Sequence, residues 1–141
     1  LADEVRRLFD DLDRARPLDR RLLPGVFSPT LDAQETPGAV DIVVDLPGVA
    51  LDDIRILIKG SVVIIAGDKM PPNPGERAEA SFHLVERDFG RFARAVRLTG
   101  AFHTAQASAT LANGELRVRV PKVEERRGRD IAVPIRRGPD A

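Results

Sequence analysis

The first sixteen residues place apolar side chains at helical spacing. Apolar residues recur three or four positions apart with charged residues between them, at Leu1, Val5, Leu8, Phe9 and Leu12. This period predicts an amphipathic helix, which Pro17 should end. The following segment, 17–30, mixes prolines and a glycine with apolar side chains such as Phe27. It predicts irregular structure.

From residue 31 to residue 121 the pattern changes to a period of two, which is typical of β-strands. Strands are predicted over 39–46, 54–58, 62–66, 91–98, 107–111 and 116–120. Lys59-Gly60-Ser61 should connect one hairpin, and Asn113-Gly114 should connect another because both of its residues tolerate positive φ. Short strands at roughly ten-residue spacing predict an all-β, antiparallel sandwich.

Two segments do not fit a sandwich that stands alone. The long loop 67–90 contains a strand-like stretch, Ser81–Glu86, that has no obvious partner nearby. After a charged linker, 122–130, the chain alternates again at Ile131, Val133 and Ile135. Pro134 interrupts this last stretch, so it cannot be a central strand and must dock on something.

Composition and charge narrow the functional classes. The chain has 141 residues, enough for one domain, and its 22 basic and 22 acidic residues cancel. Zero net charge argues against a nucleic-acid binder. No apolar run approaches the ~20 residues of a membrane helix, so no membrane span is expected. Cysteine is absent, which suits a reducing compartment, and we expect a cytoplasmic location.

Catalytic and metal-binding patterns are absent from the sequence. His83 and His103 are the only imidazoles, and neither has a second histidine or a cysteine at helical spacing, so a metal site would need carboxylates brought in by the fold. There is no phosphate-binding loop and no nucleophile elbow. Six carboxylates in the front half of the sandwich could form a glycosidase-like pair, but solvated strand faces and turn caps are the simpler interpretation: Asp32, Glu35, Asp41, Asp45, Asp52 and Asp53. We expect neither enzymatic activity nor a cofactor or metal.

Five motifs in order give the chain a family resemblance. They are VDLPGV (44–49) before Asp52-Asp53-Ile54, Glu86-Arg87 with Gly90 and Phe92, Arg94, ATLANGELRVRVP (109–121) with Lys122, and the alternation at 131–135. Together they resemble the small heat-shock proteins of the bacterial and plant type, from about Leu31 to Ile135. Glu115 and Thr99 depart from the family pattern, where an aliphatic residue and a proline are commoner.

The resemblance implies an immunoglobulin-like α-crystallin sandwich over 31–121, an N-terminal arm over 1–30 and a C-terminal extension over 122–141. It implies an ATP-independent holdase that binds unfolding proteins and assembles into a strand-exchanged dimer and a larger homo-oligomer. The crossing strand would carry Phe82, His83, Leu84 and Val85. The oligomer anchor would be Ile131, Val133 and Ile135, in either of two registers.

Two further roles follow for particular residues. Arg94 falls at the family's structural arginine, and a charge between Phe92 and Val96 requires polar partners. Carboxylates of 32–53, Glu86 or Asp88, from the same chain or from a partner subunit, could supply them. The apolar side chains of the arm are client-binding candidates, or else they pack on the sandwich or oligomer: Val5, Leu8, Phe9, Leu12, Leu23 and Phe27.

Other functions remain open at this point. A non-catalytic co-chaperone or scaffold module of similar fold would bind one folded partner, but the crossing strand and the terminal anchor suit homo-oligomers better. An enzyme that uses the acidic stretch would need a pair of carboxylates that lie in a cleft and have shifted pKa values.

Overall fold

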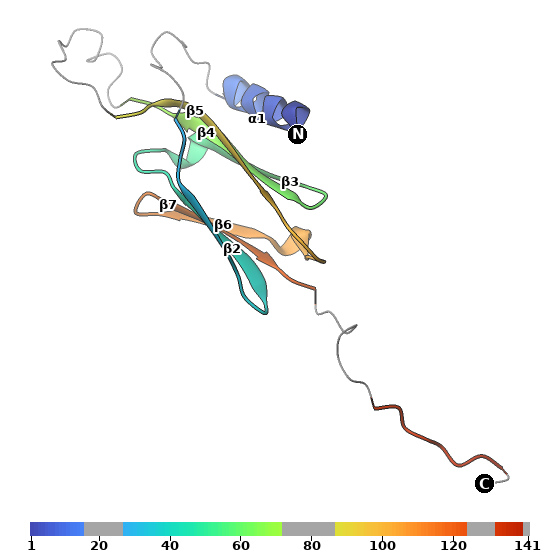
Figure 1. The fold of residues 1–141 in the computed structure, drawn as a ribbon. Coiled ribbons are helices and arrows are strands. Elements are labelled where there is room, and N and C mark those ends of the chain that lie inside the picture. Colours follow the sequence, from blue (N-terminus) through green and yellow to red (C-terminus); the bar gives the residue numbers. More distant parts are fainter. Residues whose placement is uncertain (16–26, 72–86, 124–131, 140–141) are drawn as a thin grey trace, which may run out of the picture.

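The computed structural model describes residues 1–15, 27–71, 87–123 and 132–139 (Figure 1). One α-helix, seven β-strands and two short 3-10 helices lie in these ranges. They are α1 (Ala2–Ala15), β1 (Leu31–Glu35), β2 (Ala39–Asp45), η2 (Leu51–Asp53), β3 (Ile54–Lys59), β4 (Val62–Lys69), β5 (Gly90–Arg97), η3 (Thr104–Gln106), β6 (Ser108–Ala112) and β7 (Glu115–Pro121).

The strands form two stacked antiparallel sheets (Figure 1). One sheet has the order β1-β2-β7-β6 and the other the order β3-β4-β5. Both predicted hairpins are present, with Ile58 opposite Val63 and Leu111 opposite Leu116. Asn113 and Gly114 have φ values of 52° and 75°, as a two-residue hairpin turn requires. The predicted antiparallel sandwich is therefore confirmed.

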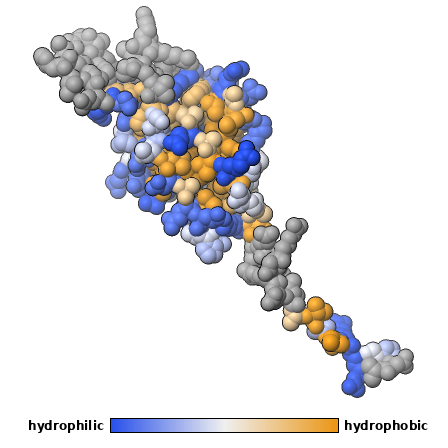
Figure 2. Space-filling model, viewed as in Figure 1, coloured by the Kyte–Doolittle hydropathy of each residue, from blue (hydrophilic) through white to orange (hydrophobic). Residues whose placement is uncertain are grey.

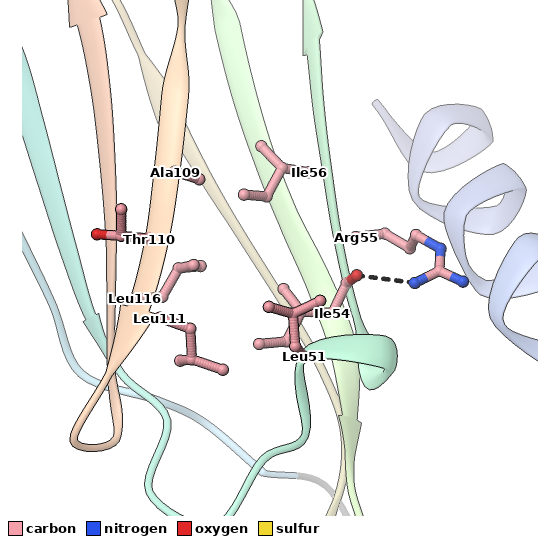
Figure 3. Close-up of a pocket in the computed structure, with 8 residues that line it drawn as sticks. All are labelled: Leu51, Ile54, Arg55, Ile56, Ala109, Thr110, Leu111 and Leu116. Carbon is pink, nitrogen blue, oxygen red and sulfur yellow. Dashed lines mark hydrogen bonds between the residues drawn. The ribbon is translucent and has the colours of Figure 1, made fainter.

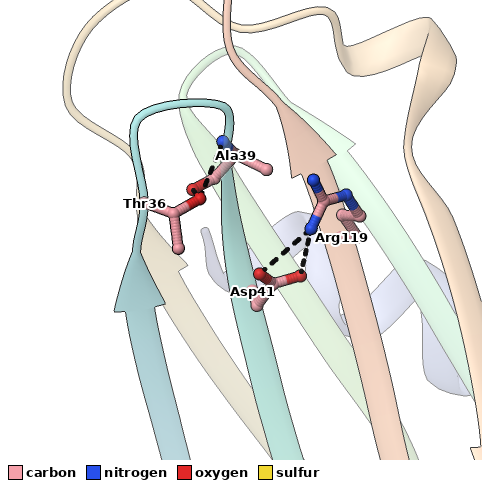
Figure 4. A network of polar contacts seen from close by, with 4 residues as sticks. All are labelled: Thr36, Ala39, Asp41 and Arg119. Atoms are coloured by element: carbon pink, nitrogen blue, oxygen red, sulfur yellow. Dashed lines mark hydrogen bonds and ion pairs between the residues drawn. The ribbon is translucent and has the colours of Figure 1, made fainter.

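Strand β1 was not predicted as a strand. Its sequence, LDAQE, buries no side chain fully, so no alternation of apolar and polar residues marks it. It forms because a short turn returns the chain along β2, which pairs Leu31 with Val44. In this turn the Thr36 hydroxyl donates to the Ala39 carbonyl at 3.1 Å and accepts from the Ala39 N–H at 3.2 Å (Figure 4).

The core lies between the sheets and is made by alternate residues of facing strands. Buried side chains from β2, β4, β5 and β7 meet there, including Ile42, Val44, Val63, Ile65, Phe92, Val118 and Val120. Each such side chain contributes roughly 1.5–3 kcal/mol when it leaves water. The helix takes no part in this core. Figure 1 shows α1 on the opposite side of the β3-β4-β5 sheet.

Gly67 on β4 allows a close approach of neighbouring groups. A Cβ atom at this position would lie 2.4 Å from the Asp53 carbonyl oxygen and 2.5 Å from Cζ of Phe92. Phe92 is 2% exposed and cannot swing into solvent. A side chain here must displace the core ring or the backbone of η2.

We expect Gly67→Ala to destabilise the sandwich by about 1–3 kcal/mol through overpacking. Gly38→Ala is the matched control, because a Cβ at Gly38 would meet nothing within 4 Å. Urea denaturation followed by circular dichroism measures both. Equal midpoints for the two variants would show that β4 and η2 can separate at little cost.

Candidate functional site

An open apolar groove runs along the side of the sandwich where β3 and β6 face each other. Two adjoining hollows of about 270 Å³ and about 240 Å³ share Ile56 and Ala109, so they form one continuous groove. We call it the β3–β6 groove. Its apolar lining is Leu51, Ile54, Ile56, Ile58, Ala107, Ala109, Leu111, Leu116 and Val118.

The groove exists because its two walls belong to different sheets. β3 is the edge strand of one sheet and β6 the edge strand of the other, so the two strands do not pair. Figure 3 shows Ile54 and Ile56 on one wall facing Leu111 and Leu116 on the other. The short side chains of Ala107 and Ala109 leave space between the walls. An extended apolar segment could insert its side chains here.

The rim of the β3–β6 groove is partly polar at one side. Arg55 points away from the groove and donates through Nη1 to the carbonyl oxygens of Asp52 and Ile54, at 2.9 Å each (Figure 3). Leu51 is 68% exposed although it is large and apolar. Figure 2 shows apolar surface gathered between the two sheets on the face where β3 and β6 lie in Figure 1. Exposed apolar surface of this kind marks a protein-binding site.

The predicted oligomer anchor is exposed in the single chain. Val133 and Ile135 are 80% and 97% exposed, and residues 132–139 form no strand. Ile131 lies outside the described residues. The predicted crossing strand, with Phe82, His83, Leu84 and Val85, also lies outside them.

The N-terminal helix covers part of the outer surface of the β3-β4-β5 sheet. Leu8 and Leu12 are only 4% and 3% exposed. Leu8 packs with Ile64 and Ala66, and partly buried side chains complete this small cluster: Val5, Phe9, Leu57 and Val62. We call the strand side of the cluster (Leu57, Val62, Ile64 and Ala66) the helix-covered face. In the single chain, the client-binding candidates on α1 thus pack within the molecule.

Two charged contacts hold the ends of α1 on the sheet. At one end Lys59 pairs with Glu4. The pKa of Glu4 is lowered to about 2, chiefly because its carboxylate accepts a hydrogen bond from Lys59. At the other end Arg91 pairs with Asp13. The Arg91 guanidinium also lies 4.7 Å from the centre of the Phe9 ring, at a distance typical of cation–π contacts.

Asp68 connects the second of these contacts to the sheet. Arg91 Nε donates to Asp68 Oδ1 at 3.1 Å, so one guanidinium joins a carboxylate of β4 to a carboxylate of α1. Asp68 is 2% exposed. Burial raises its pKa, and the charge of Arg91 opposes that rise only in part. The side chain next to it, Lys69, is buried on the other face of β4.

Lys69 and Phe27 lie together beside the core. Lys69 Nζ is 4.5 Å from the centre of the Phe27 ring and 5.8 Å from that of Phe89. Burial lowers the pKa of Lys69, the charge of Arg87 lowers it further, and Asp88 opposes both. Phe27 also meets Phe92 edge to face, with ring centres 5.7 Å apart. This client-binding candidate therefore packs on the sandwich core.

Arg94 has a backbone partner in the described part of the chain. Its Nη1 donates to the Pro29 carbonyl oxygen at 2.6 Å. This contact is with the segment that leads into β1, and a carboxylate partner from Glu86, which lies outside the described residues, or from a partner subunit stays a prediction. Arg94 thus connects β5 to the neighbouring sheet.

The acidic stretch does not form a metal site in the described residues. No group of three or more potential ligands occurs among them. Asp32, Asp45 and Asp52 are exposed, and both oxygens of Asp41 accept from Arg119 at 3.3 Å across β2 and β7 (Figure 4). Asp53 is the exception, at 5% exposed. His103 is exposed and His83 is outside the described residues. Nor does the described part contain a helix long and apolar enough to cross a membrane.

Sequence patterns did not identify the β3–β6 groove. Its walls are far apart in the chain, and the alternation at Ile54, Ile56 and Ile58 predicts a core face without showing that this face stays partly open. The exposed Leu51, just after the Pro47-Gly48 turn, is the one local sign. The Asp68–Arg91 pair was also missed, because it joins two strands across the long loop.

Comparison with known proteins agrees with this architecture. The sequence profile of the Hsp20/alpha crystallin family matches residues 32–136. The chain is 31% identical over 121 residues to heat shock protein 16 of Schizosaccharomyces pombe, covering 86% of this chain and 85% of that protein. It is 34% identical over 128 residues to the 16.6 kDa heat shock protein of Oryza sativa subsp. japonica, covering 89% and 85%.

Solved structures show the same fold. Heat shock protein 16.0 from Schizosaccharomyces pombe superposes with a TM-score of 0.67 at 29% identity, covering 77% of this chain and 99% of that one. A small heat-shock protein from Xylella fastidiosa, whose structure is described as having a distinct high order, gives 0.63 at 25% identity, covering 77% and 98%.

The buried Asp68 predicts an unusual dependence of stability on pH. Its pKa is higher in the folded chain than in the unfolded one, so the folded chain binds this proton more tightly. Its contribution to stability is therefore present at low pH and lost as the pH rises through the raised pKa. We expect Asp68→Asn to melt at or above the parent temperature at pH 7.5, with the difference shrinking toward pH 5. Asp41→Asn, on an exposed pair, should change little. If Asp68→Asn is less stable than the parent throughout that range, the ion pair with Arg91 stabilises the fold by more than burial of the Asp68 carboxylate destabilises it.

Proposed function

Because this chain belongs to the Hsp20/alpha crystallin family, we propose that it is an ATP-independent holdase, which binds unfolding proteins and prevents their aggregation. Family membership supports a chaperone role. The open β3–β6 groove supports holdase activity in particular, because its lining offers apolar side chains for contact with a client. The family is one of non-enzymatic chaperones, so no substrate turnover is expected.

Holding a client requires only apolar contact. An unfolding protein exposes apolar segments, and each gains about 25 cal/mol for every Å² that it buries. Side chains of α1, namely Val5, Leu8, Phe9 and Leu12, would add to the binding surface when the helix leaves the sheet. Such contacts are individually weak and need no nucleotide for release.

Assembly would use the long loop of the sandwich and the C-terminal extension. We assign 1–30 as an arm, 31–121 as the sandwich and 122–141 as an extension. The strand at 81–86 would pair with an edge strand of a partner subunit by β-augmentation. The linker 122–130 spans at most ~30 Å when extended, enough for Ile131, Val133 and Ile135 to reach the β3–β6 groove of a neighbour. The high order of the Xylella fastidiosa structure supports a homo-oligomer.

The holdase proposal is tested by light scattering of a heat-labile client. We expect suppression of aggregation at stoichiometric subunit ratios, equal with and without ATP. A client heated alone and a client heated with an inert protein of similar size are the controls. Aggregation at the uninhibited rate, or suppression only with ATP, would refute the proposal.

The anchor is tested by the mass of the intact assembly. We expect Val133→Ser with Ile135→Ser, or Ile131→Ser with Val133→Ser, to reduce the assembly to dimers, because two or three buried side chains at roughly 1.5–3 kcal/mol each hold the link. Which pair acts identifies the register. Arg136→Ser with Arg137→Ser is the matched control in the same tail. Parental mass in both anchor variants would assign higher assembly to residues 1–30.

A further inference from the structure

The helix-covered face is a binding site for a helix, and in this structure α1 occupies it. The sheet side consists of Leu57 from β3 with Val62, Ile64 and Ala66 from β4. On the helix, apolar residues stand at positions 5, 8, 9 and 12, the i, i+3, i+4, i+7 pattern by which an amphipathic helix lies on an apolar surface. Leu8 is buried as fully as a core side chain.

The sandwich does not need this helix to fill its core. Val63 and Ile65 point between the sheets, while Ile64 and Ala66 alternate with them and point to the other side. Ile64 and Ala66 are 1% and 0% exposed with the helix in place. If α1 left, the core would stay intact and an apolar surface would face water. Exposed apolar surface of this kind is typical of sites that bind another apolar segment.

Charges define what kind of helix fits. Lys59 lies at one end of the covered surface and Arg91 at the other, and each meets a carboxylate of α1, Glu4 and Asp13 respectively. Asp68 orients Arg91 from below. The other acidic side chains of the helix, such as Asp3 and Asp10, are exposed. The site therefore matches a helix with an apolar stripe between two carboxylates.

We propose that the helix-covered face is a binding site for amphipathic helices of unfolding client proteins, and that α1 occupies it as a built-in competitor. This inference rests on the proposed holdase function and names one class of client segment. Helices with an apolar stripe are exposed when a globular protein loses its tertiary packing, because that stripe normally faces the core. The site differs from the β3–β6 groove, which lies between the sheets and suits an extended segment.

The test is binding of a fluorescein-labelled peptide with the sequence of residues 1–15, followed by fluorescence anisotropy. The full-length chain with Leu8→Ser and Leu12→Ser should vacate the site, so we expect it to bind the peptide at least ten-fold more tightly than the parent chain. Full-length Arg6→Ser with Arg7→Ser is the matched control, since both arginines are exposed on α1. It should bind as the parent does.

Peptide variants test the recognition itself. A peptide with Leu8→Ser and Leu12→Ser should not bind. Glu4→Gln with Asp13→Asn should weaken binding three- to ten-fold, because it removes the partners of Lys59 and Arg91. Asp3→Asn with Asp10→Asn changes the net charge equally and should not. Equal loss in both charge variants would mean non-specific attraction and would overturn the proposal.

Equal affinity of the parent and the vacated chain would also overturn it. If the double variant loses its β-sheet circular dichroism, full-length Asp13→Asn, which loosens one end of the helix only, gives the same comparison with a smaller effect. Light scattering with a client separates the two proposals. Suppression of aggregation without peptide binding refutes the helix site alone, and peptide binding without suppression refutes the holdase function alone.

Discussion

The structure depends on the burial of β4 on both of its faces. Every residue from Val63 to Lys69 is buried, which is unusual in an antiparallel sheet, where one face commonly meets water. The inner face of β4 joins the sandwich core, and its outer face requires a cover. The position of α1, the tight packing at Gly67 and the burial of Asp68 and Lys69 all follow from this one strand. It also separates two apolar clusters, one between the sheets and one beneath α1.

The two surfaces that we propose as binding sites for other chains differ in how they are kept available. The β3–β6 groove stays open because its walls belong to sheets that cannot pair with each other along that side. The helix-covered face is closed by a segment of the same chain, held by contacts at both ends. The proposed sites for extended and helical segments thus lie at separate places on one small sandwich, and only the groove shares side chains with the buried core, namely Ile54, Leu116 and Val118.

Much of the fold follows from the sequence, for identifiable reasons. The alternation at Ile54, Ile56 and Ile58 and the positive-φ turn at Asn113-Gly114 are local signals, and they predicted the hairpins. The continuous apolar run 62–66 predicted a strand but not its two-sided cover, since a run carries no information on what lies against each face. β1 was missed because hydrogen bonds to β2, rather than its own side chains, make it a strand. The contact of Arg94 with the Pro29 carbonyl oxygen was not predicted, because no sequence pattern marks a particular carbonyl as a partner. The groove and the Arg91 contacts join distant segments, and only the fold brings them together.

The covalent connection between α1 and the sandwich has a consequence for how the chain responds to stress. A tethered ligand acts at a local concentration of the order of millimolar, whatever the concentration of the protein. If client helices compete for this surface as proposed, their concentration, corrected for relative affinity, would have to exceed that level before they displaced α1. Dilute or briefly exposed helices would therefore be ignored, and abundant ones captured. The length of the segment 16–26 would set this threshold, so a longer tether would make the same surface a more sensitive detector.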